Sequence, residues 1–362
     1  MRTQSYGYHH IMQSVMLVAV LLPVVAACSW ISEELPECPP SEVHLRFEYD
    51  YNMMRSDVFK DHVGGLTVFV FDDNNNLVTQ RSENDKERLK VYGYEMVFSD
   101  LEPDREYRFL ALAYQKGEEE ILQMPGAKFR RTEMKNGDPI EQLNVKLDRE
   151  SDANADGTIR VPHENRALDT LWISRNDCRA KVRLQENVTT TLNLMRHTNN
   201  LTVTLRQTDC PADINIEDFE IKVTDRNGWV NYDNSLREDN QLTYTPYARW
   251  NTDFKDDEGT VVQRAAHADL SFPRLIYYED WRENARLTIF NKKTNTQVAD
   301  INLPDYLAQG RNSTEQQYSE QEFLDREYVF KLDFFLKGDT WDYVNLSISV
   351  LSWSVRIQNI NL

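Results

Sequence analysis

The sequence predicts an all-β protein with two β-sandwich domains. Three observations support this class: apolar and polar residues alternate with a period of two in many short segments, turn-forming residues separate these segments, and helical periodicity is scarce. The chain has 362 residues, of which 40% are hydrophobic and 11% aromatic. It is therefore longer than one average domain and has enough apolar material for packed cores, which excludes a disordered chain.

The first block of predicted strands begins at Val43. Residues 43–49, Val-His-Leu-Arg-Phe-Glu-Tyr, alternate as a half-buried strand does. Residues 66–71 and 77–79 flank the run Asp-Asp-Asn-Asn-Asn, which predicts a β-hairpin because Asn and Asp tolerate the positive φ of a tight turn. Further strands are expected over residues 106–114 and 143–147, and a short connector with helical character over residues 52–63.

A second block of strands begins near Thr189. The predicted strands of this block cover residues 189–194, 201–205, 219–223, 285–290, 297–303, 328–336, 343–351 and 353–357, with short helices over residues 303–308 and 321–325. Asn227-Gly228, before Trp229, predicts a hairpin with a type I′ turn. We expect an N-terminal sandwich domain over residues 43–184 and a C-terminal one over residues 185–362, with the boundary near residues 180–188.

Residues 1–27 have the order of a secretory signal. Arg2 precedes an apolar run over residues 11–25, which is too short for a comfortable membrane span, and Ala26 and Ala27 lead to Cys28. A cysteine after small residues resembles the lipobox of bacterial lipoproteins. The resemblance implies cleavage between Ala27 and Cys28, and a diacylglycerol thioether and an N-acyl chain, such as palmitate, on Cys28. Two or three acyl chains hold a protein stably at a membrane, with residues 28–42 as a Pro-rich, acidic tether.

The acidic composition excludes some classes of partner. A net charge of −18 at pH 7 repels phosphate backbones, so nucleic acid is not expected as a partner, and it disfavours electrostatic docking on anionic lipid. The four cysteines, Cys28, Cys38, Cys178 and Cys210, form no Cys-x-x-Cys motif, and no metal site is expected from them. With Cys28 lipidated, the other three leave room for one disulfide, and the sequence leaves its pairing open.

Motifs of enzymes are absent from the sequence. It contains no His-Glu-x-x-His, no Gly-x-Ser-x-Gly and no phosphate-binding loop, and its histidines are scattered. We therefore expect no catalytic residues, and no cofactor besides the covalent lipid on Cys28.

Several segments follow one another in a familiar order. They are Cys38 before Pro39, Phe-Glu-Tyr-Asp-Tyr-Asn at residues 47–52, Asp-Val-Phe-Lys-Asp-His-Val at residues 57–63, Val-Phe-Val-Phe-Asp at residues 68–72, and Trp-Ser-Val-Arg-Ile-Gln at residues 353–358. Together they resemble FimB-type fimbrial anchor lipoproteins from the lipobox to the C-terminus. The resemblance implies two transthyretin-like β-sandwiches and a lipid-anchored, surface-exposed position in the outer membrane at the base of a type V pilus. It also implies a fimbrial shaft subunit (fimbrillin) as partner, a role in tying the shaft to the membrane, and a limit on its growth.

One loop begins like a calcium-binding motif. Asp152, Asn154 and Asp156, followed by Gly157, match the first half of an EF-hand loop. The position of the bidentate Glu is taken by His163, and the residues before the loop are typical of a strand. A solvated acidic turn is therefore the favoured interpretation.

Aromatic residues gather in the second block. The tryptophans there are Trp229, Trp250, Trp281, Trp341 and Trp353. Exposed aromatics on one face can stack on sugar rings, so a surface glycan-binding lipoprotein is the alternative function. The favoured interpretation is that alternating aromatics fill the sandwich cores. Two indoles exposed side by side would support glycan binding, and burial of most of them would remove its main support.

Overall fold

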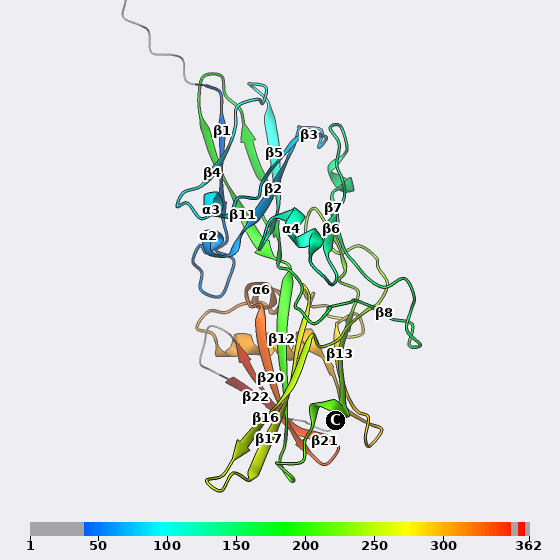
Figure 1. Cartoon of the computed structure of the whole chain (residues 1–362). Coiled ribbons are helices and arrows are strands. Elements are labelled where there is room, and N and C mark those ends of the chain that lie inside the picture. The colour runs from blue at the N-terminus through cyan, green and yellow to red at the C-terminus, as the bar shows by residue number, and fades with distance from the viewer. Residues whose placement is uncertain (1–39, 349–353, 359–362) are drawn as a thin grey trace, which may run out of the picture.

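The computed structural model describes residues 40–348 and 354–358. The signal segment, Cys28 and nearly all of the tether lie outside these ranges. The fold is all-β, as the sequence predicts, with strands in four sheets and only short helices. Figure 1 shows an elongated molecule, in which β1 begins at the upper end and the second half of the chain forms the lower end.

An eight-stranded sheet forms the upper half. Its strands follow the order β3-β2-β5-β9-β11-β1-β4, and β10 pairs with β5 outside this path. The strands are β1 (Val43–Glu48), β2 (Gly65–Phe71), β3 (Leu77–Glu83), β4 (Glu95–Phe98), β5 (Glu106–Tyr114), β9 (Leu171–Ser174), β10 (Cys178–Lys181) and β11 (Val188–Arg196). Arg81 of β3 donates to the Val97 carbonyl of β4, so the two edges of the sheet meet and enclose a hydrophobic core.

Two sheets form the lower half. The six-stranded sheet has the order β16-β17-β12-β20-β21-β22, and the five-stranded sheet has the order β19-β18-β13-β15-β8. Their strands are β8 (Ile159–Arg160), β12 (Thr198–Gln207), β13 (Phe219–Asp225), β15 (Leu242–Tyr244), β16 (Ala248–Lys255), β17 (Val261–Pro273), β18 (Arg286–Asn291), β19 (Thr296–Asn302), β20 (Val329–Lys337), β21 (Thr340–Ile348) and β22 (Ser354–Gln358). Inward side chains of these sheets share one core, which includes Val203 of β12, Ile289 of β18 and Leu332 of β20.

Short helices lie in the connections. They are α2 (Phe59–His62), α3 (Lys86–Leu89), α4 (Glu118–Gln123), η1 (Ile140–Gln142), η2 (Ile216–Asp218), α5 (Leu303–Ala308), η3 (Gln309–Ser313) and α6 (Glu320–Arg326). The side chains of Asn302 and Ser319 accept backbone N–H groups of the first turns of α5 and α6, which explains where these two helices begin. Both helices agree with the sequence prediction.

The two halves are interlocked by strand pairing. A three-stranded sheet, β14-β7-β6, joins β14 (Trp229–Asn231) of the second half to β7 (Asn144–Leu147) and β6 (Phe129–Arg131) of the first. In addition, β8 pairs in parallel with β15. The chain passes from the upper sheet to the six-stranded sheet between β11 and β12. β11 therefore belongs to the upper sheet, although it comes after the predicted division between residues 184 and 185. The division into two domains stays a prediction.

The two predicted hairpins have different outcomes. The β2–β3 hairpin is confirmed, with Asn75 at a φ of 60° and the Asp72 amide bonded to the Asn76 carbonyl. The prediction of a hairpin around Asn227-Gly228 is wrong, because the two flanking strands do not pair with each other: β13 pairs with β15 and β18, and β14 pairs with β7. Asn227 is buried, and its side-chain amide donates to the carbonyls of Pro273, the last residue of β17, and of Arg274. A Cβ at position 228 would lie 2.4 Å from a Leu242 methyl carbon, so the side chains around Gly228 would have to shift to admit one.

Candidate functional site

The N-terminal strand β1 is built into the upper sheet. It runs parallel to β11, with Val43 opposite Val188, and antiparallel to β4, with Val43 opposite Phe98. Its alternating apolar side chains face the core, and Leu45 is 0% exposed and Phe47 6% exposed. The period-two pattern of residues 43–49 therefore predicted both the strand and its buried face correctly. The protein fills this position of the sandwich with its own chain.

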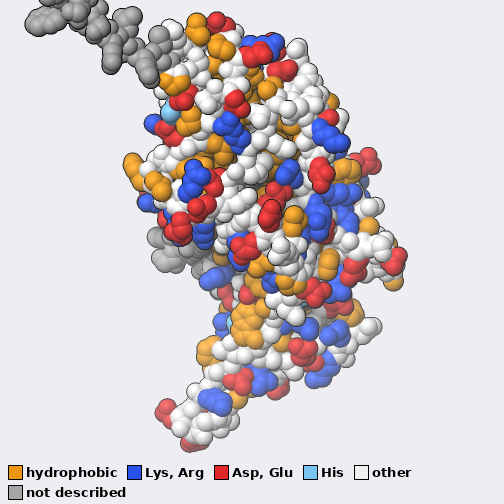
Figure 2. Space-filling model, turned by 45° about the horizontal axis from the view of Figure 1, so that its top comes forward, with side chains coloured by type: hydrophobic (Ala, Val, Ile, Leu, Met, Phe, Trp, Pro, Cys, Tyr) orange, Lys and Arg blue, Asp and Glu red, His pale blue; other side chains and the backbone are white. Residues whose placement is uncertain are grey.

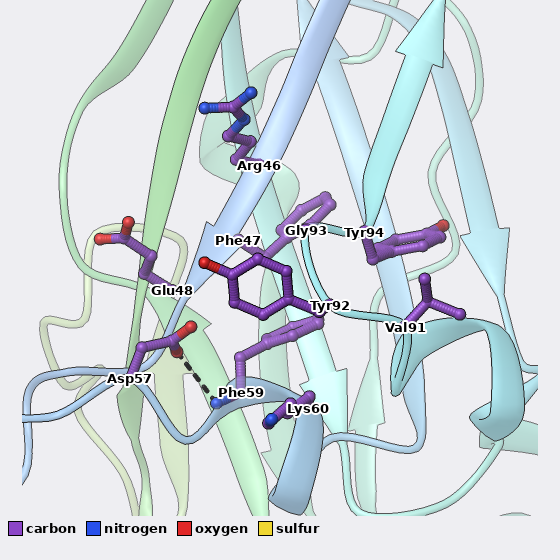
Figure 3. A pocket seen from close by; sticks show the side chains of 10 residues that line it. All are labelled: Arg46, Phe47, Glu48, Asp57, Phe59, Lys60, Val91, Tyr92, Gly93 and Tyr94. Carbon is purple, nitrogen blue, oxygen red and sulfur yellow. Dashed lines mark hydrogen bonds between the residues drawn. The ribbon is translucent and has the colours of Figure 1, made fainter.

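A groove of about 540 Å³ opens where β4 ends. The β1–β4 ladder stops at Arg46 opposite Glu95, so the last residues of β1 have a ladder neighbour only on the β11 side among the described strands. Figure 3 shows the rings of Phe47 and Phe59 at the base of the groove, with Tyr92 in front of them. The two phenylalanine rings stack with 5.6 Å between centroids, whereas Tyr92 is 91% exposed. The groove thus has an apolar base and one aromatic side chain in solvent.

Charges of both signs surround this groove. Glu95 bonds to His44 Nδ1 at 2.7 Å and to Arg46 Nε at 2.6 Å. The hydrogen bond that the His44 ring donates to Glu95 raises the pKa of His44 and lowers the pKa of Glu95. Burial raises the pKa of Tyr94 to about 12. Within residues 40–348 and 354–358, no cluster of three or more His, Cys, Asp or Glu could hold a metal ion.

The loop after β1 contacts the lower half through stacked cations. The ring of Tyr51 lies between two guanidinium groups, 4.3 Å from Arg175 and 4.2 Å from Arg326 of α6. Arg326 also donates to the Asn52 carbonyl at 3.4 Å. Such cation–π contacts contribute about 0.5–2 kcal/mol each, more when they are shielded from water. This contact ties the end of the β1 segment to α6.

A buried polar network lies at the passage from β11 to β12. His197 Nε2 bonds to the side-chain oxygen of Asn234 at 2.7 Å, and the Asn234 amide donates to the Ser174 carbonyl of β9. Arg274 binds the Asp325 carboxylate of α6 at 2.6 and 2.9 Å. Burial lowers the pKa of His197 to about 3, so its imidazole is neutral at physiological pH. The network joins strands and loops of both halves.

A second link lies at the interlocked strands. Arg149 and Asp239 form an ion pair at 2.6 Å, with side chains that are 10% and 2% exposed. The indole N–H of Trp229 donates to the side-chain oxygen of Asn144 at 2.7 Å. The Lys146 ammonium lies over the same indole, 4.2 Å from its ring centre. These contacts link the two halves of the chain. The sequence contained no signal for them, because each joins residues far apart in the chain.

The loop predicted as a calcium candidate is a compact turn on β8. Asp156 accepts from the amide and hydroxyl of Thr158, and its other oxygen lies 3.4 Å from the Lys222 ammonium. Asn154 bonds to the Thr158 side chain, and Gly157 has a φ of 83°. The turn therefore employs Asn154 and Asp156 in its own hydrogen bonds. Calcium binding by Asp152, Asn154 and Asp156 stays untested.

The tryptophans differ in exposure. Trp341 is buried and Trp229 partly buried, whereas Trp250 is 40% and Trp281 58% exposed. Trp250 lies along β16 and stacks on His267, while Trp281 belongs to the loop that follows the far end of β17. The two exposed indoles thus do not form a side-by-side pair, and Trp353 lies outside the described residues.

Two cysteines lie within the described residues. Cys178 is buried in β10 and Cys210 is exposed after β12, and both are free thiols, so they are not bonded to each other. Burial raises the pKa of the Cys178 thiol. Cys38, the third candidate for a disulfide, lies outside the described residues.

Together these features define a class of protein: two interlocked β-sandwich halves in which the N-terminal strand completes its own sheet. The chain belongs to the family of fimbrillin-A associated anchor proteins Mfa1 and Mfa2, whose sequence profile matches residues 35–359. This confirms the resemblance seen in the sequence. Membership makes the protein a structural component of the fimbrial anchor or adhesin type, associated with fimbrial subunits at the cell surface.

Solved structures share this fold over most of their length. A candidate adhesin from Bacteroides thetaiotaomicron is 29% identical, with 90% of this chain and 100% of that chain covered and a TM-score of 0.71. A candidate polysaccharide-binding protein from the same species is 26% identical, with 88% and 98% covered and a TM-score of 0.68. The fimbrial anchor protein Mfa2 from Porphyromonas gingivalis is 18% identical, with 88% and 99% covered and a TM-score of 0.58, which shows the same sandwich fold.

Two further comparisons complete this description. No curated protein sequence matches the chain. Among the described residues, every helix is too short or too polar to cross a membrane.

Proposed function

We propose that this protein anchors the base of a type V fimbrium in the outer membrane and ends the growth of the shaft. One end of the link is the acylated Cys28, with residues 28–42 as a tether. The other end is a strand-mediated contact with the shaft subunit, in which main-chain hydrogen bonds supply the contact and side-chain pockets choose the partner. Family membership and the adhesin-like relatives support this proposal.

The observation that carries the proposal is the position of β1. In the resembling family, shaft subunits assemble by strand exchange after proteolysis removes their first strand. Here Val43, Leu45, Phe47 and Tyr49 are all buried, and β1 pairs with β11 along its whole length and with β4 as far as Arg46. Burial of four such side chains contributes roughly 6–12 kcal/mol, which is comparable with the whole stability of a domain. A chain that keeps this strand leaves no gap at the β1 position for the strand of a further subunit, and strand exchange at this position ends with it.

The lipid end of the link is tested by Cys28→Ala. Because Cys28 precedes every described strand and helix in the chain, the variant should be a folded protein that leaves the outer-membrane fraction. The measurement is immunoblotting of membrane, periplasmic and medium fractions, with Cys210→Ala as a control that should remain in the membrane. Fractionation of Cys28→Ala with the outer membrane would count against the lipid anchor.

Glycan binding is the second candidate, and it is favoured by the exposure of Trp250 and Trp281. A relative described as a candidate polysaccharide-binding protein is consistent with it. The two indoles lie at separate places, so at most one of them could stack on a given sugar ring. Binding of the protein to immobilised mucin, abolished by Trp250→Ala or Trp281→Ala, would favour this function over anchoring.

A further inference from the structure

We propose that the open edge of β16 receives an extended strand of the fimbrial shaft subunit. The inference rests on the proposed anchor function, which requires a contact with the shaft, and it adds the place of that contact. β16 is the edge strand of the six-stranded sheet, and β17 is its ladder neighbour among the described strands. Its eight residues are all exposed or partly exposed.

Among the strands of the described ranges, the outer edge of β16 has no ladder partner for its backbone groups. The backbone amide of Arg274, the residue after β17, donates to the His197 carbonyl, which precedes β12. Backbone groups point to opposite sides at successive residues of a strand, so the even-numbered residues of β17 direct theirs toward β12 and the odd-numbered residues direct theirs toward β16. The partners of the odd-numbered residues in β16 include Trp250 and Thr252. Because backbone groups alternate along a strand, Arg249, Asn251 and Asp253 direct theirs away from β17, to the open edge. An extended polypeptide is the ligand that matches such a row of donors and acceptors.

Side chains hold this edge ready for a partner. On one face, Trp250 is 40% exposed and stacks on His267 with 5.0 Å between ring centroids, and Phe254 is 43% exposed. On the other face, the Asn251 side chain accepts the Ile216 amide of η2 at 2.9 Å. The contact with η2 therefore holds β16 on one face, while Trp250 and Phe254 remain accessible on the other. Rigid, exposed aromatics are typical anchors of protein interfaces.

The charges beside the edge are already paired within the chain. Arg249 lies 3.2 Å from Glu217, and Asp253 lies 2.5 Å from Arg264. Figure 2 shows acidic and basic side chains interspersed over the face in view, rather than one large patch of a single sign. The partner strand thus needs no strong charge. Apolar residues at alternate positions, to cover Trp250 and Phe254, are the chemistry that fits.

The position in the molecule suits the distal end of an anchor. In Figure 1, β1, the first described strand, begins at the upper end, and the β16–β17 hairpin forms the lower tip. A strand added to β16 would lie at the end opposite the start of β1. The edge of β4 suits this role less well, because it is four residues long and its Val97 carbonyl already accepts from Arg81.

The test measures how the full-length, detergent-solubilised protein co-sediments with fimbriae sheared from a strain that lacks it. Asp253→Pro removes the outward N–H donor, and Asp253→Ala is the matched control that also loses the Arg264 pair but keeps the donor. We expect Asp253→Pro to weaken binding about tenfold relative to Asp253→Ala. Trp250→Ala, as a second variant that keeps the backbone, should weaken binding roughly thirtyfold. Tyr92→Ala, an exposed aromatic of the upper half, should bind as the wild type does.

Each other outcome overturns a different claim. If the wild-type protein does not co-sediment, the anchor function fails and the edge proposal with it. If the wild type and both β16 variants co-sediment equally, the anchor function stands and the β16 edge is not the contact. Unchanged co-sedimentation, with a wild-type dimer that Asp253→Pro converts to monomer in gel filtration, assigns the edge to self-association. Unchanged co-sedimentation, with loss of mucin binding in Trp250→Ala, assigns the aromatic face to glycan. Both of these last results also overturn the proposal.

Discussion

Replacement of Leu45 by Ala tests whether β1 is an integral strand of the upper sandwich. Leu45 is 0% exposed at the centre of β1, between Thr190 of β11 and Met96 of β4. Loss of three carbon atoms costs about 2.4 kcal/mol of transfer free energy, and the cavity that remains raises the total to between about 2.7 and 5 kcal/mol. Urea unfolding followed by tryptophan fluorescence should show this decrease as a lower midpoint at an unchanged slope.

The matched control for Leu45→Ala is the neighbouring Arg46→Ala. Arg46 is exposed and pairs with Glu95 at the surface, and such a pair contributes at most about 1 kcal/mol. The reasoning requires a clear gap between the two variants. Leu45→Ala within about 0.5 kcal/mol of the wild type, the range of ordinary surface substitutions, would show that β1 contributes little to the folded sandwich. The argument that a retained strand ends assembly would then lose its structural basis.

The remaining predictions concern the interlocked strands, a buried acid and the acidic turn. Arg149→Ala should lower the free energy of unfolding, measured in urea, by about 3–5 kcal/mol, because it leaves the Asp239 carboxylate buried and unpaired. The control Arg160→Ala loses only a surface pair with Glu150 and should lower it by less than about 1 kcal/mol. Equal effects of the two substitutions would contradict the link between the halves. Burial raises the pKa of Asp225 from 3.8 to about 7, so its contribution to stability is complete below pH 3.8 and is lost as the pH rises through about 7. The difference in free energy of unfolding between the wild type and Asp225→Asn should therefore fall by up to about 4 kcal/mol between pH 4 and pH 8. A difference that does not depend on pH would show that burial does not raise the pKa of Asp225. Calorimetric titration with calcium should give no binding heat, and heat that is lost in Asp156→Ala would establish a calcium site instead.

The sequence predicted the strands whose two faces differ. β1, β2, β5, β12 and β20 each bury one face or both, and their apolar residues mark them plainly. The two short helices over residues 303–308 and 321–325 were also predicted, and the structure shows Asn302 and Ser319 as their N-caps. The resemblance to fimbrial anchors came from the order of short segments in the sequence. It could be recognised without knowing which residues are buried or which strands pair.

Other elements could not be predicted because long-range contacts determine them. β16 is exposed on both faces and so lacks a regular alternation, and β8 has only two residues. Asn227-Gly228 has the composition of a tight turn, yet Asn227 is buried and donates to backbone carbonyls at the end of β17. The groove beside Tyr92 likewise has no local signal, since it arises where β4 stops short of the end of β1.

The most direct test of the anchor function is the length and attachment of fimbriae in cells that lack the protein. Electron microscopy and immunoblotting of sheared fimbriae should show fimbriae that are abnormally long or released into the medium. Wild-type protein should restore short, attached fimbriae, and Cys28→Ala should fail to restore attachment. Normal, cell-attached fimbriae in the deletion strain would contradict the anchor function.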